Sequence, residues 1–251
     1  MSDLQFTGEY VIPGRTPYII YQEHIGRYIF AGAFTKNKLV LDVACGTGYG
    51  TEYLLSRGAK MVVGLDISAD AINYARSKFD RSKGLHFIRA DAANFPFSDS
   101  SFDIIVSFET IEHLKDQSEF LAECKRVLKN DSLFISSTPN KLISSPDTEK
   151  PVNPFHIKEF YPDEFRHLLC KHFTGVTLYG QSDITLAKTN VLTTVSSLLA
   201  NIPLGSIIRS TLRKVVFSKN MDKRYSVHKF INVTVNASLY MVAVAKKKAG
   251  S

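Results

Sequence analysis

Short apolar runs alternate with amphipathic stretches along the first 140 residues. The runs predict buried parallel β-strands, because strands that are covered on both faces are almost continuously apolar. They lie at Leu39–Val43, Met61–Leu65, Leu85–Arg89, Ile104–Val106 and Leu133–Ser137. The stretches between them, such as 51–56 and 71–75, place apolar residues at helical spacing. This alternation predicts an α/β domain of three layers, with a mostly parallel sheet between helices.

The C-terminal part predicts further strands separated by an insert. Phe173–Tyr179, Phe230–Val235 and Leu239–Ala245 alternate or run apolar as strands do. Between the first two, apolar residues recur at helical spacing from Leu192 to Ile202. We therefore expect four parts: N-terminal lid helices (1–36), a core (37–182), a basic helical insert (183–229) and strands that complete the core sheet (230–251).

A glycine-rich loop follows the first strand. Residues 40–50 read VLDVACGTGYG, in which Gly46, Gly48 and Gly50 permit a tight turn and a close approach of a ligand to the backbone. The alternate spacing differs from a dinucleotide fingerprint, and the Asp42 carboxylate favours a ligand that carries an ammonium group over a pyrophosphate. Ala44, Cys45 and Thr47 complete the predicted loop contacts. A purely structural turn is the alternative.

Later strands also end in polar residues. Asp66, with Ile67 after it, lies about twenty residues beyond the loop, where a carboxylate can accept hydrogen bonds from both hydroxyls of a ribose. A charge at a helix N-terminus is the alternative role for Asp66. Ser107 ends the fourth strand at the sheet edge where open α/β folds bind ligands.

This set of motifs resembles motifs I to IV of the class I S-adenosylmethionine-dependent methyltransferases. The resemblance implies a Rossmann-like fold with a seven-stranded, mostly parallel sheet and an antiparallel C-terminal strand, and S-adenosylmethionine as the cofactor. It places Asp91 and Ala92 beside the adenine, and Ser107 beside the methionine moiety.

Other segments narrow the resemblance. FTGEYVIPG, EHIGRY, SFETIEHL, STPNK and NPFHIKEFYPDEF, within residues 6–180, are similar to bacterial and archaeal methyltransferases associated with glycan and glycosyl-transfer pathways. In these, the N-terminal helix folds over the cofactor, which implies that Arg27 pairs with the methionine carboxylate and that Tyr18 or Tyr21 covers the site. The alternative for Arg27 is a surface charge on an amphipathic helix.

Three residues are candidates for catalysis. A sugar hydroxyl is a weak nucleophile at neutral pH, so a base within hydrogen-bond reach would assist its methylation. His113 and His156 lie on loops predicted to open at the ligand edge, and Glu112 precedes His113. Glu112 and Glu109 are expected as a secondary base or as hydroxyl acceptors. The alternative is a structural role for both histidines. No spacing of acids and histidines indicates a metal site.

Composition and cysteine content limit the class of protein. The chain has 251 residues, 44% of them hydrophobic, which is ample for one α/β domain. Cys45, Cys124 and Cys170 form no close pair, which argues against a disulfide framework and a zinc site. Cys45 is expected to be a packing residue. The N-terminus lacks the pattern of a signal peptide, so we expect a cytoplasmic protein.

Basic charge is concentrated near the C-terminus. Residues 183–251 hold 11 Lys or Arg and 2 Asp or Glu, whereas residues 1–182 hold 20 and 22. The insert is expected to be a lid or dimer face, or to contact an anionic membrane surface peripherally through residues 184–220. Nucleic acid is the least favoured partner, because few aromatic residues are interleaved with the cations.

The leading hypothesis for function is S-adenosylmethionine-dependent O-methylation of a sugar or lipid-linked glycan. Polar residues such as Glu109, Glu112, Asn140 and Asn153 favour a hydroxylated acceptor. The alternatives are a methyltransferase for another small molecule, such as a quinone-like or polyketide acceptor, and a non-catalytic module that binds the cofactor.

Overall fold

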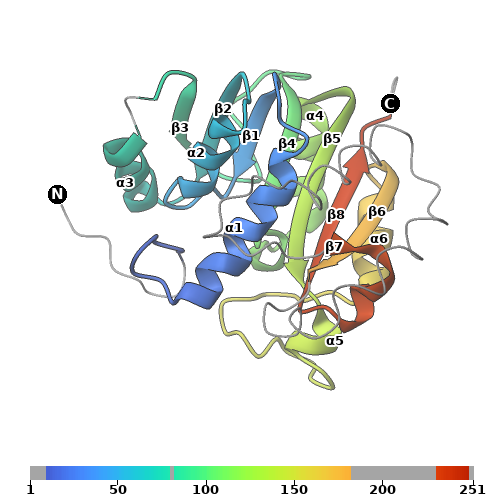
Figure 1. Ribbon diagram of the computed structural model, residues 1–251. Helices are drawn as coiled ribbons and strands as arrows, with labels where there is room; N and C mark the ends of the chain where they lie inside the picture. The colour runs from blue at the N-terminus through green and yellow to red at the C-terminus, as the bar shows by residue number, and fades with distance from the viewer. Residues whose placement is uncertain (1–9, 80–81, 182–229, 249–251) are drawn as a thin grey trace, which may run out of the picture.

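A single mixed sheet forms the centre of the molecule. The computed structural model describes residues 10–79, 82–181 and 230–248, and Figure 1 shows their arrangement. The strands are β1 (Leu39–Val43), β2 (Met61–Asp66), β3 (Leu85–Arg89), β4 (Phe102–Phe108), β5 (Leu128–Pro139), β6 (Thr174–Gln181), β7 (Phe230–Ile231) and β8 (Tyr240–Lys246). Their order is β3-β2-β1-β4-β5-β8-β6-β7. Without the two-residue strand β7, this is the predicted seven-stranded sheet.

The parallel half of the sheet contains the five predicted strands. β3, β2, β1, β4 and β5 pair in parallel, with Val40 opposite both Val62 and Ile104. The strand order reverses at β1 and β4, and ligands bind at the carboxyl ends of the strands beside such a switch point. The fold therefore directs the glycine loop after β1 to the expected binding edge.

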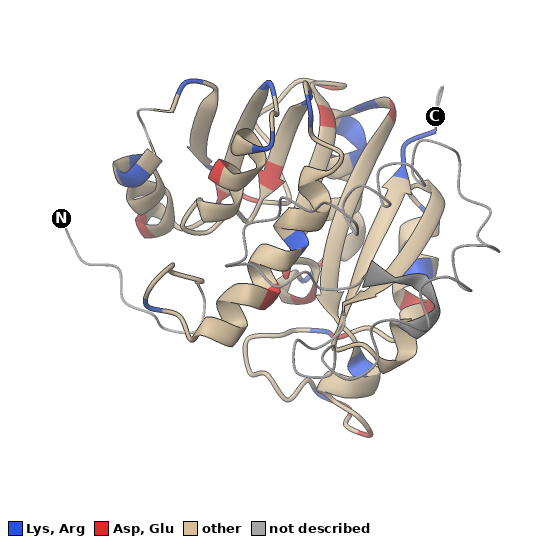
Figure 2. Cartoon of the chain, viewed as in Figure 1, with Lys and Arg blue, Asp and Glu red and all other residues tan. Residues whose placement is uncertain are grey.

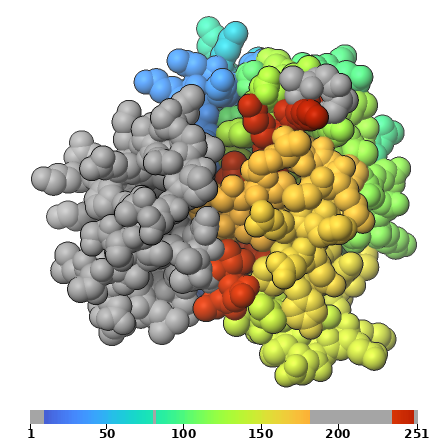
Figure 3. Space-filling view, turned by 90° about the vertical axis from the view of Figure 1, so that its right-hand side faces the viewer, coloured from blue at the N-terminus to red at the C-terminus, as the bar shows by residue number. Residues whose placement is uncertain are grey.

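The antiparallel half comes from the C-terminal part of the chain. β8 lies between β5 and β6 and pairs antiparallel with both. Figure 3 shows the right-hand side of the molecule in Figure 1, where residues 141–181 and 230–248 lie side by side. The predicted strand at 230–235 is wrong in extent, because the strand ends at Ile231 and a 3₁₀-helix, η3 (Asn232–Ala237), follows it.

Helices cover both faces of the sheet. On one face lie α1 (Tyr18–Gly32), α2 (Tyr49–Ser56) and α3 (Ala69–Phe79), and on the other lie α4 (Gln117–Val127) and α6 (Pro162–Cys170). In β1, Val40 packs on the α1 side, whereas Leu41 and Val43 pack on the α4 side. The three predicted layers are confirmed, and α1 crosses in front of the sheet in Figure 1.

Side-chain caps set several helix boundaries. The Ser68 hydroxyl accepts a hydrogen bond from the Ala71 N–H at the start of α3, and Asp116 accepts one from Glu119 at the start of α4. The short elements η1 (Ile111–His113) and α5 (Lys141–Ser144) lie in loops at the carboxyl edge of the sheet. Figure 2 shows charged residues on the helices and in the loops that connect the strands.

The expected N-terminal lid contains one helix, α1, within the described residues. The expected basic insert (183–229), with the predicted membrane-contacting residues 184–220, lies outside the described residues. Among the described helices, none combines the length and the apolar character that a membrane span requires.

The approach of α1 to α2 depends on a glycine. A Cβ atom at Gly50 would lie only 2.0 Å from the Tyr28 ring. We expect Gly50→Ala to reduce the free energy of unfolding by about 1–3 kcal/mol, because the Tyr28 ring must move out of a packed interface. Urea unfolding measures this change. Ser56→Ala, at an exposed position of the same helix, is the control and should stay within about 0.5 kcal/mol. Equal stability of both variants would contradict the packing argument.

Candidate functional site

A cavity of about 590 Å³ opens at the carboxyl ends of β1, β2 and β4. Its lining comes from the glycine loop, the ends of β2 and β4, the segment after β3, helix α1 and the loop 153–156. Ten predicted site residues line it: Ala44, Cys45, Gly46, Thr47, Asp66, Ile67, Asp91, Ala92, His113 and His156. The fold thus gathers residues from distant parts of the chain at one edge of the sheet.

The glycine loop has two distinct glycine positions. Gly46 (φ 53°) and Gly48 (φ 79°) both occupy the left-handed region that favours glycine. A Cβ at Gly46 would meet nothing within 4 Å, whereas one at Gly48 would lie 2.7 Å from Phe87 and 2.9 Å from Ala75. Gly46 therefore leaves the backbone open to a ligand, and Gly48 lets the loop pack on β3 and α3.

Asp66 holds this loop and also lines the cavity. Its carboxylate accepts hydrogen bonds from the backbone N–H groups of Gly46 (2.8 Å) and Ser68 (2.9 Å). Burial raises its pKa, although these bonds oppose the increase. Each carboxylate oxygen accepts more than one hydrogen bond, so the group retains capacity for a ribose hydroxyl. Asp91 and Ala92 lie nearby after β3, as a site for an adenine requires.

Asp42 lies behind the loop and does not line the cavity. Its fully buried carboxylate accepts hydrogen bonds from the hydroxyls of Thr51 (2.7 Å) and Tyr28 (3.2 Å). Burial raises its pKa to about 7 despite these bonds. Asp42 therefore joins β1, α1 and α2, and the structure does not place it against the ammonium group that the sequence suggested.

Arg27 is fully buried, so the alternative of a surface charge is wrong. One guanidinium nitrogen donates to Gln181 Oε1 (2.7 Å), and Nε lies 3.9 Å from Glu109 Oε1. Within the described part of the chain, Nε and Nη2 have no hydrogen-bond partner. The guanidinium also lies over Tyr240, a cavity residue. Arg27 itself does not line the cavity and already lies within ion-pair distance of Glu109, so its pairing with a methionine carboxylate stays a prediction.

Four other predicted contacts do not line the cavity. Ser107 is buried in β4, and Gly48 faces β3 and α3. Tyr18 is 67% exposed, and Tyr21 packs against Tyr49. Cys45 is buried, and its pKa is raised by that burial, which agrees with a packing role.

The three predicted catalytic residues come together at the other end of the cavity. Ligand-type atoms of Glu112, His113 and His156 lie within 4.8 Å of one another. Glu112 is buried beneath the two histidines that line the cavity, and one of its oxygens accepts from Thr138 (3.0 Å). Burial, and then the nearby charge of Glu109, raises the pKa of Glu112. Glu109 also lines this end.

Sequence reasoning missed several lining residues. Tyr28, Tyr49 and Tyr240 come from two helices and the last strand, and Tyr28 forms edge contacts with Tyr49 and Phe108. Tyr28 and Tyr49 lie within the segments EHIGRY and VLDVACGTGYG but have no predicted role there, whereas Tyr240 lies in no such segment and reaches the cavity only through the packing of β8. Thr47 also has an unpredicted partner, since its hydroxyl donates to the Val11 carbonyl (2.6 Å).

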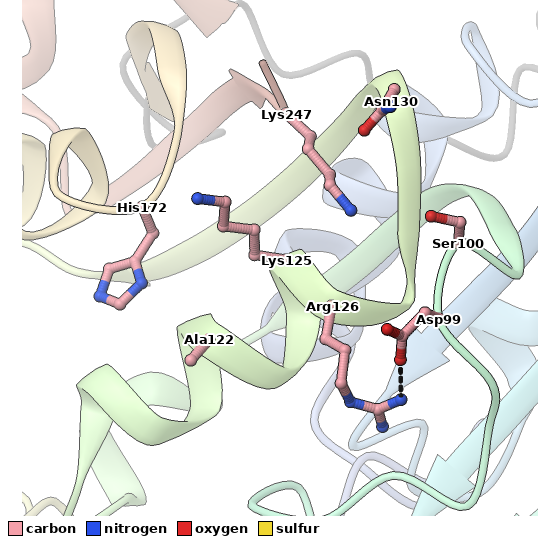
Figure 4. A pocket seen from close by; sticks show the side chains of 8 residues that line it. All are labelled: Asp99, Ser100, Ala122, Lys125, Arg126, Asn130, His172 and Lys247. Atoms are coloured by element: carbon pink, nitrogen blue, oxygen red, sulfur yellow. Dashed lines mark hydrogen bonds and ion pairs between the residues drawn. The ribbon is translucent and has the colours of Figure 1, made fainter. Parts of the chain in front are cut away.

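A second pocket, of about 540 Å³, lies near the amino ends of β4 and β5 (Figure 4). Two of its cationic residues already have partners, since Arg126 pairs with Asp99 (2.9 Å) and Lys247 donates to the Leu128 carbonyl (2.7 Å). It lies at the sheet edge opposite the glycine loop. The first cavity is therefore the candidate functional site.

Residues 41–136 match the family described as methyltransferase domain. The chain is 36% identical over 186 residues to a Mycobacterium tuberculosis protein named probable S-adenosylmethionine-dependent methyltransferase MT3114, and the match covers 70% of this chain and 64% of that protein. It thus spans less than two thirds of that relative. It is also 34% identical over 122 residues to a fatty-acid O-methyltransferase of Mycolicibacterium smegmatis, covering 48% of this chain and 44% of the relative.

A solved structure confirms the fold. The complex between the Haloferax volcanii Trm112 methyltransferase activator and a methyltransferase aligns with a TM-score of 0.63, covering 92% of this chain and 92% of the matched chain. The identity is 18%, so this likeness concerns the fold alone.

Asp42 should affect the pH dependence of stability. Because its native pKa is raised to about 7, the native state retains a proton that the unfolded chain loses at lower pH. This contribution to stability is present below about pH 4 and is lost as the pH rises to about 7. Asp42→Asn should therefore weaken the fall in unfolding free energy across this range, by at most about 4 kcal/mol.

Urea unfolding of both proteins at several pH values measures the difference. Asp70→Asn, at an exposed position, is the control and should behave as the unsubstituted protein does. Parallel pH profiles for the unsubstituted protein and Asp42→Asn would contradict the assignment.

Proposed function

We propose that the protein is a class I S-adenosylmethionine-dependent methyltransferase that transfers a methyl group to a hydroxyl of a lipid-linked glycan, because residues 41–136 match the methyltransferase-domain family and the chain is similar to probable S-adenosylmethionine-dependent methyltransferases. The cavity is the observation that carries this proposal. A nucleoside-type end, with Asp66 and the glycine loop, and a polar end, with two histidines and Glu109, lie in one space at the sheet edge.

The cofactor supplies an electrophilic methyl group on a sulfonium centre. The task of the chain is then to hold an acceptor oxygen in line and to exclude water. His156 is suited to accept the acceptor's proton, because its Nδ1 hydrogen-bonds Glu159 Oε1 (2.6 Å) and leaves Nε2 as the basic nitrogen. His113, whose Nδ1 lies 2.9 Å from the Phe155 carbonyl, has the same arrangement.

Apolar side chains near the polar end support an amphiphilic acceptor. Ile20 on α1 and Phe155 on the opposite loop line the cavity and are 37% and 50% exposed. Tyr18 and Ile19 on α1, and Val152 and Ile157 near Phe155 in the sequence, are exposed as well. A glycan hydroxyl fits the histidine end, and a lipid chain fits the exposed apolar rim. We also propose the peripheral membrane contact expected for residues 184–220, which would bring the cavity to such an acceptor.

A second acceptor class is favoured by one relative. The similarity to a fatty-acid O-methyltransferase favours a lipid carboxylate as the second candidate acceptor. A methyl ester is cleaved by mild alkali, whereas a methyl ether on a sugar is not. Lipid extracts incubated with the protein and isotope-labelled cofactor distinguish the two, and the glycan proposal expects alkali-stable label that acid hydrolysis releases in a methylated sugar. Alkali-labile label would overturn it in favour of the carboxylate.

Cofactor binding should depend on Asp66. Asp66→Asn removes the charged acceptor for the ribose, and hydrogen bonds to charged groups contribute about 1.5–3 kcal/mol. The dissociation constant should therefore rise about tenfold to a hundredfold, as calorimetry with S-adenosylmethionine would measure. Asp70→Asn, at an exposed position in the first turn of α3, is the matched control. Unchanged affinity of Asp66→Asn would contradict the assignment.

The histidine end should act on turnover. His156→Ala should lower turnover about a hundredfold or more, because the acceptor loses its base, while affinity for the cofactor stays within a few fold. Isotope transfer measures turnover, and calorimetry measures affinity. If turnover and cofactor affinity fell equally, His156 would be a structural residue of the pocket and not the base.

A further inference from the structure

Glu112, His113 and His156 form a cluster that we call the EHH cluster. Glu112 and His113 are neighbours on η1, whereas His156 is 43 residues further along the chain. The backbone N–H groups of Ile157 and Lys158 both donate to the Glu112 carbonyl, at 2.8 and 3.1 Å. These bonds fasten the loop that carries His156 to η1, so the fold itself builds the cluster.

Nδ1 of each histidine has a hydrogen-bond partner. The Phe155 carbonyl can only accept, so His113 Nδ1 must carry the proton of that hydrogen bond. The Glu159 carboxylate fixes the same tautomer in His156. In the neutral rings, Nε2 is then the nitrogen with a lone pair, and this is the form of histidine that ligates metal ions.

Asn153 gives independent evidence for this tautomer of His156. Its Oδ1 accepts from the Phe155 N–H (3.0 Å), which assigns its Nδ2 as the atom 2.9 Å from His156 Nε2. An amide N–H donates to that nitrogen, so Nε2 carries a lone pair. Asn153 is exposed and can rotate away when a stronger ligand arrives.

Glu112 supplies the third donor. It is fully buried, and its Oε1 has no hydrogen-bond partner among the described residues. Its Oε2 is held by Thr138. An unsatisfied buried carboxylate oxygen is costly, and a cation is the ligand that most directly satisfies it. Each residue of the EHH cluster thus has a supporting hydrogen bond, the pattern that orients metal ligands.

We propose that the EHH cluster binds a divalent transition-metal ion of the zinc class. Two imidazole nitrogens and one carboxylate favour such an ion over magnesium, which prefers oxygen ligands. The donor atoms lie within 4.8 Å, and tetrahedral ligation requires about 3.3 Å between them. Binding of the ion would therefore have to draw these side chains closer together.

Three protein ligands leave a coordination position open on the side of the cavity that His113 and His156 line. With the ion bound, His156 Nε2 would be a ligand and not a free base, and the ion would instead lower the pKa of an acceptor hydroxyl that binds there. The site would therefore select acceptors whose oxygen atoms can ligate a metal. Metal binding itself does not depend on the proposed methyl transfer, although both use the same end of the cavity.

Cobalt(II) titration of the full chain, freed of metal and of any histidine tag, tests the proposal. We expect one Co²⁺ per chain, with visible absorption bands of a four- or five-coordinate site that Zn²⁺ abolishes and Mg²⁺ does not. Calorimetry should give a Zn²⁺ affinity at least tenfold higher than in His113→Ala, His156→Ala and Glu112→Gln. His167→Ala, at an exposed position on α6, is the matched control and should bind as the unsubstituted protein does.

Retained S-adenosylmethionine affinity and circular dichroism establish that a variant is folded. Absence of the bands, or equal Zn²⁺ affinity in folded variants of the cluster, would overturn the metal site. The cobalt and zinc measurements do not depend on methyl transfer. The metal site can therefore be disproved while the proposed methyl transfer is confirmed, and methyl transfer can be disproved while the metal site is confirmed.

Discussion

The buried carboxylate of Asp42 is the interaction on which the cofactor end of the cavity depends. Asp42 lies on β1, which precedes the glycine loop. Its carboxylate binds Thr51 of α2, which follows the loop, and Tyr28 of α1. Since a buried carboxylate is costly without donors, the two hydroxyls must remain in place, and so must the helices that carry them. The close contact of Gly50 with Tyr28 adds a steric constraint at the same junction.

The polar end of the cavity has a different support. There the Glu112 carbonyl accepts hydrogen bonds from the loop that carries His156. The Glu112 side chain is buried close to His113 and His156. Nδ1 of each histidine is hydrogen-bonded to a fixed acceptor, and both rings line the cavity together. The two ends thus differ in chemistry: one has oxygen acceptors suited to a nucleoside, and the other has nitrogen bases suited to an acceptor hydroxyl or a metal ion.

Most of the fold follows from local patterns. The five parallel strands could be predicted because each is a short apolar run followed by turn or capping residues. The predicted strand at 230–235 is wrong beyond Ile231, since alternation over a few residues does not distinguish a strand from the 3₁₀-helix that the chain forms there. The insert at 183–229 and its expected roles remain predictions.

The sequence by itself determined the glycine loop, Asp66 and Asp91, because these follow strand ends at regular spacing and parallel strands bring their carboxyl ends to one edge. Only the tertiary structure decided that Asp42 is internal, that Arg27 is fully buried and that Glu112 and His113 meet His156. The reason is physical. Strand ends are positioned by local periodicity, whereas burial and side-chain encounters depend on how helices and loops that are distant in sequence pack against the sheet.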